Sequence, residues 1–499
     1  MLPSKYDFVI VGGGTSGLVV ATRLSQDPNI SVLVLEAGED HSPGPWVTTP
    51  ALWSSLLGTD FDWRYLSEAQ AALNAACAHL GLDYIDEKSL AKFTGPIQAS
   101  FAEEVNDPLP KAWVETFKSL GYAVSGDPFT GGAVGGYVNV MNIHPATKQY
   151  SHARNAYYEP VRTRDNLHIV ASASVNEIFL ERQKTEVIAN GIYTSRMMKR
   201  TVMASKEVIL AAGVFNTPKL LELSSIGSAS LLDSLKILVV IDNDNVGENL
   251  QDRPNGGVSF EVRDGFETVD DLARQDMAAI GAAMEAYSKD QSGPFATGGN
   301  FAGGFLPVLD FLSPDGKEDL EKILQSQVRD SKQFSKDHAA FVESLLHTGS
   351  EGSGGFFSYP ALGNFVPETG TKMAIDPKYL SNPLDLEVLA RHVRFIGKIA
   401  SLEPLWSPLK LDGRMSHDAP ANLDDLDEVK EYVKKVALSC WNPTSTCAML
   451  PLEKDGVVDT NLIVCGTKNL RIVDASVIPL STRGNCQTSV YAVAERAAD

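Results

Sequence analysis

The sequence predicts an α/β fold in which a Rossmann-like sheet is interrupted by a second, α+β domain. Three observations predict it. A glycine-rich turn lies between two apolar runs at the start of the chain, and strand-like apolar runs recur far downstream, at residues 208–212 and 470–474. The middle, residues 256–439, mixes helical segments with glycine-rich breaks. We therefore expect the middle to be inserted into a domain whose strands come from distant parts of the chain.

The glycine-rich turn has the parts of a dinucleotide-binding βαβ unit in their usual order. An apolar run at residues 8–11 precedes it, and a helix-compatible segment and a second apolar run lead to Glu36. Gly12 permits the tight turn, Gly14 lets a pyrophosphate approach the backbone, and Gly17 lets helix and strand pack closely. The helix N-terminus attracts phosphate, and Glu36 can accept hydrogen bonds from a ribose diol. The pattern predicts an adenine dinucleotide site, and the alternative is a glycine-rich turn without a ligand.

Length, composition and charge limit the class of protein. A chain of 499 residues with 43% apolar content can bury a large core and suggests two or three domains, or two interleaved ones. The formal net charge of −20 would repel phosphates, so we expect no nucleic-acid partner. No run of about 18 apolar residues is present, so we expect no membrane partner. The oligomeric state stays open.

The N-terminus and the cysteines suggest a cellular compartment. The chain start runs directly into the first apolar strand and leaves no room for a secretory signal, so we expect an intracellular, cytoplasmic protein. The five cysteines contain no CxxC pair, and no histidines cluster at zinc spacing, so no metal site is predicted. The cysteines are expected to be reduced thiols, with a Cys440–Cys447 bridge as the alternative.

Several further motifs follow in one order along nearly the whole chain. After VIVGGGTSGLVVATRLS at 9–25 come RTRDNLHIVASASVNEI at 162–178, AAGVFNTPKLLELSSIG at 211–227 and VGENLQDRP at 246–254. DPKYLSNPLDLE follows at 376–387, and NPTSTCAMLPLEKDGVVDT opens the tail at 442. With these motifs the chain resembles the glucose-methanol-choline (GMC) oxidoreductases, FAD enzymes that oxidise alcohols, and most of all their fungal, natural-product-associated branch. Ser225 stands where that family's second signature usually has Gly.

The resemblance implies a domain division and a set of cofactor contacts. An FAD-binding domain would combine residues 1–70, 165–255 and 435–499, and a substrate-binding domain with an antiparallel sheet over the flavin would combine 95–164 and 256–434. Carried over by position, the FAD contacts would be Gly12, Gly14, Thr15, Ser16 and Gly17 at the pyrophosphate, Glu36, Ala37 and Val175 at the adenosine, Asp474 and Ala475 near the pyrophosphate and ribityl chain, and Gln487 and Thr488 near the isoalloxazine. A strand-end cap is the alternative role for Asp474.

The two catalytic positions of the family are both asparagines here. Family members take the proton of the substrate hydroxyl with a histidine, because imidazole exchanges protons near neutral pH. Asn442 matches that position, and Asn485 matches the second, where the family has His or Asn. A carboxamide can orient a hydroxyl or stabilise an alkoxide but cannot accept its proton. A base would have to be another histidine, with His144 and His152 as candidates by location, or a carboxylate, or the substrate itself.

A second departure lies between residues 65 and 95. Family members carry a Gly-Gly-Ser-Ser loop there that runs along the flavin and, in some members, provides the covalent attachment residue. This chain has instead an alanine-rich stretch at 71–82, which predicts a short helix. We therefore expect noncovalent FAD with fewer contacts to retain it. Arg253 also replaces a histidine of the family motif, and we expect it to be structural.

These features leave three functional readings. The first is a flavin-dependent oxidoreductase that acts on a CH–OH or activated CH group of a small natural-product substrate. The second is a non-redox isomerase, dehydratase or cyclase on the same scaffold, in which two amides stabilise developing oxyanion charge. The third is a catalytically inactive binding protein. Aromatic residues at 356–365 fit an aromatic substrate pocket, although core packing explains them equally well.

Overall fold

The structure is a computed structural model of the chain. It describes residues 3–39, 48–50, 72–73, 95–101, 109–122, 124, 134–184, 186–194, 200–266, 268–297, 302–326, 333–359, 378–410, 413, 416 and 418–499. Within these ranges, no helix combines the length and the apolar character needed to cross a membrane.

A seven-stranded mixed sheet forms the larger core. Its order is β7-β2-β1-β10-β9-β8, and β17 also pairs with β10. The pairs among β7, β2, β1, β10 and β17 are parallel, whereas β8, β9 and the start of β10 form an antiparallel extension. The strands are β1 (Lys5–Val11), β2 (Val32–Leu35), β7 (Leu167–Val170), β8 (Val175–Gln183), β9 (Glu186–Thr194), β10 (Arg200–Leu210) and β17 (Leu470–Ile472).

The centre of the sheet brings distant segments of the chain together. Ile10 of β1 lies opposite Ile209 of β10, which in turn lies opposite Arg471 of β17. Strands buried on both faces read as continuous apolar runs, and Val208, Ile209 and Leu210 are at most 2% exposed. The predicted Rossmann-like sheet with strands from both ends of the chain is therefore confirmed.

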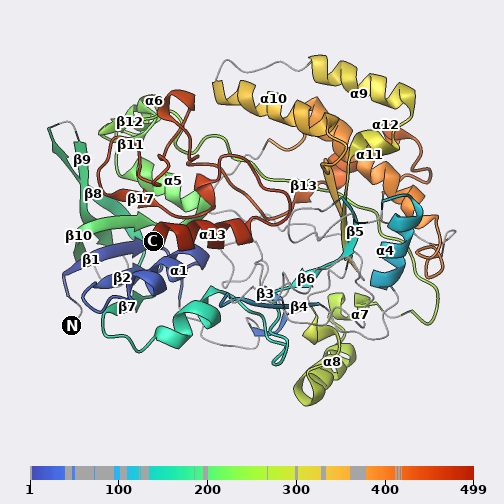
Figure 1. Cartoon of the computed structure of the whole chain (residues 1–499), viewed down its shortest axis with the longest axis horizontal. Helices are drawn as coiled ribbons and strands as arrows, with labels where there is room; N and C mark the ends of the chain where they lie inside the picture. The colour runs from blue at the N-terminus through green and yellow to red at the C-terminus, as the bar shows by residue number, and fades with distance from the viewer. Residues whose placement is uncertain are drawn as a thin grey trace.

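Two helices from opposite ends of the sequence pack together beside this sheet. Helix α1 (Thr15–Leu24) lies against α13 (Gln487–Ala498), as Figure 1 shows. The Arg23 guanidinium donates to both oxygens of Glu495, at 2.7 and 2.8 Å, and the Tyr157 hydroxyl donates to the same carboxylate at 2.7 Å. Helix α5 (Gly213–Leu223) follows β10 directly. These contacts fix the C-terminal end of α1 against α13.

A second, smaller core lies around α4 (Leu109–Ser119) and α11 (Pro383–Ala400). Strands β14 (Ala302–Leu306) and β15 (Gly354–Ser358) pair antiparallel, so the described residues contain the antiparallel pairing predicted for the inserted region. Phe356 is 7% exposed and packs edge-on against Phe117 and Phe395, which assigns it to core packing. The division into two domains at the expected boundaries stays a prediction.

The remaining strands and helices lie outside the large sheet. The strands are β3 (Ala72–Leu73), β4 (Gln98–Phe101), β5 (Gly135–Val138), β6 (Val140–Met141), β11 (Ile226–Gly227), β12 (Ile241–Asp242), β13 (Pro254–Asn255) and β16 (Leu438–Ser439). The helices are a π-helix (Arg154–Tyr158), α6 (Ala229–Ser234), α7 (Asp270–Ala273), α8 (Met277–Asp290), α9 (Pro314–Ser326), α10 (Gln333–His347) and α12 (Leu426–Val436), with short 3₁₀ turns at Glu159–Val161, Pro294–Ala296, Val308–Phe311, Leu452–Lys454 and Ala475–Val477.

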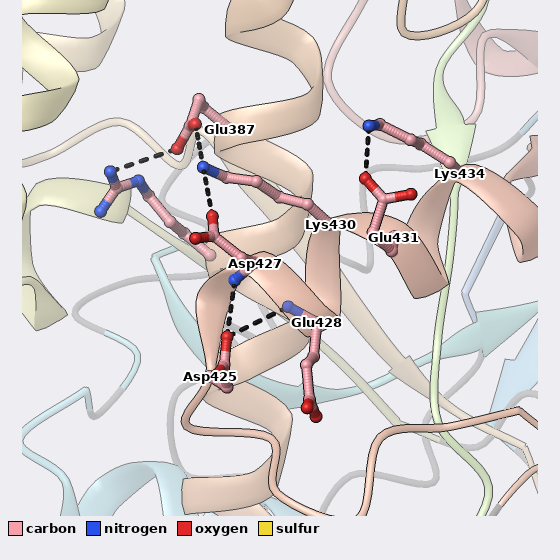
Figure 2. A network of polar contacts seen from close by, with 8 residues as sticks. Glu387, Asp425, Asp427, Glu428, Lys430, Glu431 and Lys434 are labelled. Atoms are coloured by element: carbon pink, nitrogen blue, oxygen red, sulfur yellow. Dashed lines mark hydrogen bonds and ion pairs between the residues drawn. The ribbon is translucent and has the colours of Figure 1, made fainter.

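A charged network joins α11 to α12 (Figure 2). Glu387 of α11 pairs with the Arg391 guanidinium at 3.2 Å and with the Lys430 ammonium of α12. Glu387 and Arg391 are only 8% and 3% exposed. At the start of α12, the Asp425 carboxylate accepts the backbone N–H groups of Asp427 and Glu428, at 3.0 and 3.1 Å, as an N-cap. Of these contacts, the Glu387–Lys430 ion pair is the one that joins the two helices.

Candidate functional site

The glycine turn after β1 has the close contacts that its sequence predicts. Gly12 has φ +109°, and a Cβ there would lie 2.2 Å from the Ala211 carbonyl oxygen. A Cβ on Gly17 would lie 2.0 Å from the Gly12 carbonyl oxygen. In contrast, a Cβ on Gly14 would meet nothing within 4 Å. The turn is therefore tight on its protein side and open at Gly14, where a pyrophosphate is predicted to approach.

Glu36 closes this turn from the end of β2. Its Oε2 accepts the N–H of Gly13 at 2.7 Å, and its Oε1 accepts the N–H of Gly38 at 2.7 Å. Each carboxylate oxygen keeps a second acceptor site, so the group can still bind a ribose diol. The Ala173 N–H donates to the Glu36 carbonyl oxygen at 2.8 Å, which brings the segment leading to Val175 beside Glu36 and Ala37. The structure thus gathers the three residues predicted for the adenosine.

The Asp474 carboxylate, unlike that of Glu36, is fully hydrogen-bonded by groups of the protein. Its Oδ2 accepts from the Gly213 N–H at 3.0 Å and the Thr217 hydroxyl at 2.6 Å, and its Oδ1 accepts from the Ser476 N–H at 2.9 Å and hydroxyl at 2.5 Å. Burial raises the pKa of this carboxyl, and the four donors oppose that shift. All four acceptor sites are used inside the protein. The side chain therefore ties β17 to α5, as the cap alternative states, and a cofactor contact here would come from the backbone of Asp474 and Ala475.

The start of α13 meets the start of α1. The Gln487 side-chain amide donates to the Thr15 hydroxyl at 3.2 Å, so two residues predicted to contact the cofactor touch each other across 472 positions. Gln487 is 9% exposed, and its Oε1 is buried without a hydrogen-bond partner among the described residues. Ser16 is buried in α1, and Thr488 is exposed. An unpartnered acceptor beside an open glycine turn at a helix N-terminus fits a bound dinucleotide.

Asn442 and Asn485, which lie 43 positions apart in sequence, are in direct contact. Asn442 Nδ2 donates to Asn485 Oδ1 at 3.3 Å and also to the Cys440 carbonyl oxygen, and Asn442 Oδ1 accepts the Cys486 N–H at 3.2 Å. Asn442 is 3% exposed, whereas Asn485 is exposed. No partner of Asn485 Nδ2 is found among the described residues. The amide pair is therefore asymmetric, with a buried Asn442 in contact with an exposed Asn485.

Three polar residues that the sequence analysis missed form a network with Asn442. The Asp252 carboxylate accepts the Asn442 N–H at 3.3 Å, the Ser439 hydroxyl at 2.5 Å and the Tyr379 hydroxyl. Burial, followed by the hydrogen bond to Asp252, raises the pKa of Tyr379. Asp252 and Tyr379 lie within the quoted motifs VGENLQDRP and DPKYLSNPLDLE. No spacing signal connects them, because they are 127 positions apart and only the fold brings them together.

The candidate bases do not join the amide pair. The His144 ring accepts the N–H groups of Ala146 and Thr147, at 3.2 and 3.3 Å, and so closes its own turn. Burial, reinforced by nearby Arg154, lowers the pKa of His152 to about 4. Among the described residues, neither histidine is hydrogen-bonded to Asn442 or Asn485.

Burial disfavours the reactive thiolate form of Cys440 and Cys447. Cys440 and Cys447 are both free, so the alternative bridge is absent. Burial raises the pKa of Cys440 to about 11 and that of Cys447 well above its ordinary value, so both stay protonated at neutral pH. Cys77 and the stretch corresponding to the missing flavin loop lie outside the described residues, apart from Ala72 and Leu73. Those two residues form β3 and not the predicted helix.

The fold and the glycine turn define a dinucleotide-binding α/β protein, and comparison with known sequences gives its family. Two GMC oxidoreductase family models match residues 50–255 and 367–494, together more than half of the chain, and a model for an NAD(P)-binding Rossmann-like domain matches residues 10–71. The chain belongs to the GMC oxidoreductase family.

Relatives and solved structures agree with this assignment. Dehydrogenase citC of Monascus ruber is 28% identical over 606 aligned positions, covering 100% of this chain and 96% of the relative. A GMC oxidoreductase family protein of Malassezia sympodialis is 28% identical, covering 99% of this chain and 92% of the relative. Formate oxidase of Aspergillus oryzae has the same fold, with a TM-score of 0.81 at 24% identity and coverage of 100% and 98%. A fungal aryl-alcohol oxidase gives a TM-score of 0.77 at 22% identity, with the same coverage.

These findings confirm several predictions. The family, its fungal natural-product branch, the enzyme class of flavin-dependent oxidoreductase and FAD as the cofactor are as predicted. The alignment with the Monascus dehydrogenase is longer than the 499 residues of this chain, so the relative contains segments without a counterpart here. The roles of individual residues stay predictions.

Proposed function

We propose that this protein oxidises a CH–OH or activated CH group of a small, natural-product-like molecule, with Asn442 and Asn485 in place of the family's histidine. The observation that carries the proposal is the asymmetric amide pair: a 3.3 Å contact that fixes Asn485 and leaves its Nδ2 without a partner among the described residues. An exposed donor held by a buried neighbour is suited to binding an oxygen of a substrate.

The cofactor would be held noncovalently by the residues already described. The open turn at Gly14, the N-terminus of α1, the Glu36 carboxylate and the unpartnered Oε1 of Gln487 supply the contacts. When bound, FAD supplies the hydride acceptor that this chemistry needs. Release of intact FAD into the supernatant on acid precipitation would show that it is noncovalent, and flavin that stays in the pellet would contradict that.

The two asparagines would have different tasks. Both hydrogens of Asn442 Nδ2 are already donated, to Cys440 and to Asn485, so Asn442 orients its neighbour and has no donor left for a substrate. Asn485 Nδ2 would donate to the substrate oxygen and stabilise negative charge that develops there. Neither amide can accept a proton at physiological pH, so proton removal would fall to solvent, to the substrate or to a carboxylate.

A non-redox reaction on the same scaffold is the second candidate, favoured by the absence of a titrating side chain hydrogen-bonded to Asn485 within the described part of the chain. An isomerase, dehydratase or cyclase would use Asn485 as an oxyanion donor in the same position. The two candidates predict different spectra for the purified flavoprotein.

An anaerobic visible spectrum, recorded before and after addition of a panel of primary, secondary and aromatic alcohols, separates the candidates. Loss of the oxidised-flavin bands with one of the alcohols, together with formation of the carbonyl product, would support oxidation. A flavin spectrum that no alcohol changes, although dithionite still reduces the flavin, would contradict the proposed oxidation and leave the non-redox candidate.

A further inference from the structure

Three consecutive residues, Gln251, Asp252 and Arg253, lie between the two segments that carry the asparagines. Their backbone follows the first segment, residues 439–446. The Gln251 N–H donates to the Thr444 carbonyl oxygen at 3.2 Å, the Thr444 N–H donates back at 2.8 Å, and the Cys440 N–H donates to the Arg253 carbonyl oxygen at 3.0 Å. The next residues continue this pairing as β13 with β16. The three residues are thus extended and fixed along one side of the Asn442 segment.

Two of the three side chains reach the second segment, residues 479–485. Gln251 Nε2 donates to the Pro479 carbonyl oxygen at 3.0 Å, and Gln251 Oε1 accepts the Ser481 N–H at 2.9 Å. The Arg253 guanidinium donates to the Thr482 carbonyl oxygen. Alternate side chains of an extended segment point the same way, so positions 251 and 253 act on one neighbour while 252 faces another. These contacts end three residues before Asn485.

Asp252, the middle residue, fixes the Asn442 segment from its side chain. It accepts the Asn442 N–H and the Ser439 hydroxyl, and that hydroxyl in turn accepts the Trp441 N–H at 2.6 Å. Trp441 has φ +56°, in the left-handed region that a bulky side chain rarely adopts. Backbone of this kind persists only where its surroundings hold it, and such positions gather at functional sites. Asp252 and Ser439 provide that hold.

We propose that residues 251–253 are a positioning segment that sets Asn442 and Asn485 at hydrogen-bond distance. Asp252 fixes the buried asparagine, while Gln251 and Arg253 fix the approach to the exposed one. This role also accounts for Arg253, because its guanidinium donates to the Thr482 carbonyl oxygen of the second segment. The expected change in flavin reduction rate rests on the proposed function. The expected change in the distance between the two asparagines does not depend on the reaction.

The test compares variants of this segment with matched variants elsewhere. Asp252→Asn removes the carboxylate that holds the first segment, and Arg253→Ala removes one of the three side-chain contacts to the second. Asp7→Asn is the control for the first variant, because the Asp7 carboxylate also accepts a serine N–H and two serine hydroxyls, each at 2.9 Å. Asp7 lies in β1, away from the end of this strand that leads into the glycine turn. Arg164→Ala is the control for the second, because Arg164 donates to the Thr22 carbonyl oxygen at 2.7 Å. Crystal structures of the holoenzymes give the distance between Asn442 Nδ2 and Asn485 Oδ1, and anaerobic stopped-flow with benzyl alcohol gives the flavin reduction rate.

We expect the amide contact to open beyond hydrogen-bond distance in Asp252→Asn and Arg253→Ala, and to persist in both controls. Because displacement of a positioned group by about 1 Å can cost about 100-fold, the limiting reduction rate should fall by about that factor with little change in half-saturation. Arg253→Lys should restore part of the contact and serves if the alanine variant does not fold. An unchanged amide contact in the segment variants, or the same opening in the controls, would overturn the proposal. Wild-type flavin that no alcohol reduces would defeat the proposed function alone, since the crystallographic distances still decide the positioning role.

Discussion

Two polar clusters of this protein differ in the kind of side chain at their centre. The cluster between α11 and α12 consists of formal charges, with Glu387 held between Arg391 and Lys430 in a buried interface (Figure 2). The cluster around Asn442 and Asn485 contains two uncharged amides and ends in an exposed donor without a partner among the described residues. In the first cluster opposite charges pair inside the protein, although Glu387 Oε2 and Arg391 Nε find no hydrogen-bond partner among the described residues. In the second cluster the donor without a partner belongs to an exposed residue, so an external molecule can reach it. The comparison teaches that an exposed donor without a partner indicates a site better than a dense cluster of buried charges does.

The largest effect should come from replacing Asn442 itself by a residue that can accept a proton. Asn442→His places an imidazole where the family has its base, and a general base contributes about 10²–10⁴ in rate. If redox chemistry with alcohols is latent, anaerobic flavin reduction by an alcohol should accelerate by a factor in that range. The measurement is stopped-flow reduction across an alcohol panel, with Asn442→Gln as the non-titrating control. An equal gain in both variants would show that the proton acceptor is not the cause.

The charged cluster should respond in stability and not in reduction rate. Glu387→Ala leaves Arg391, only 3% exposed, without its buried counter-charge, and breaking such a pair costs about 3–5 kcal/mol. Chemical unfolding should report this loss, while the flavin reduction rate of the folded protein stays at the wild-type value. The double variant Glu387→Leu/Arg391→Leu should recover most of the stability. If the single variant slowed reduction without loss of stability, the cluster would belong to the site.

A smaller stability effect is expected at the start of α12. The Asp425 side chain caps the helix by accepting two backbone N–H groups, and replacing such a cap by alanine costs about 1 kcal/mol. Asp425→Ala should lower the free energy of unfolding by about that amount, and Asp425→Ser should retain most of it. A loss as large as that of Glu387→Ala would mean that the network acts as one unit.

The smallest effect concerns pH. The hydrogen bond from Arg23 lowers the pKa of Glu495 below its ordinary value of 4.5, despite partial burial. A lowered folded-state pKa stabilises the protein above the unfolded value, and this stabilisation disappears as pH falls through the folded one. Glu495→Gln should therefore be less stable than wild type at pH 7, and the difference should shrink as the pH falls below 4.5. A difference that does not change with pH would assign the effect to packing of α1 against α13.

Sequence alone could predict the elements whose signals are local. The turn at Gly12 to Gly17 and the apolar runs of β1, β2, β10 and β17 each carry a motif or a burial pattern, and all form as expected. In the middle region, where helical segments were expected, α7 and α8 are separate helices, because Gln275 has φ +60° and Asp276 caps α8. The alanine-rich prediction failed at β3, where pairing with β4 overrides propensity. Helix α12 was missed, although its Asp425 cap and apolar spacing were readable.

The site was only half predictable, for a related reason. Asn442 and Asn485 were found because each replaces a recognisable residue inside a motif. Asp252, Tyr379 and Ser439 were missed because their significance comes from hydrogen bonds that span 127 to 190 positions, which no spacing rule connects. At Ser225 the structure explains the family's usual glycine, since that residue has φ +73°.

The most direct test of this account is to compare wild type with Asn485→Ala by anaerobic flavin reduction, using an alcohol that reduces the wild-type protein. Loss of one oxyanion-type donor costs about 10²–10³ in rate, so we expect the variant to be slower by that factor with its unfolding midpoint and flavin content unchanged. Reduction at the wild-type rate in Asn485→Ala would contradict the claim that the amide of this exposed residue is the group that acts on the substrate.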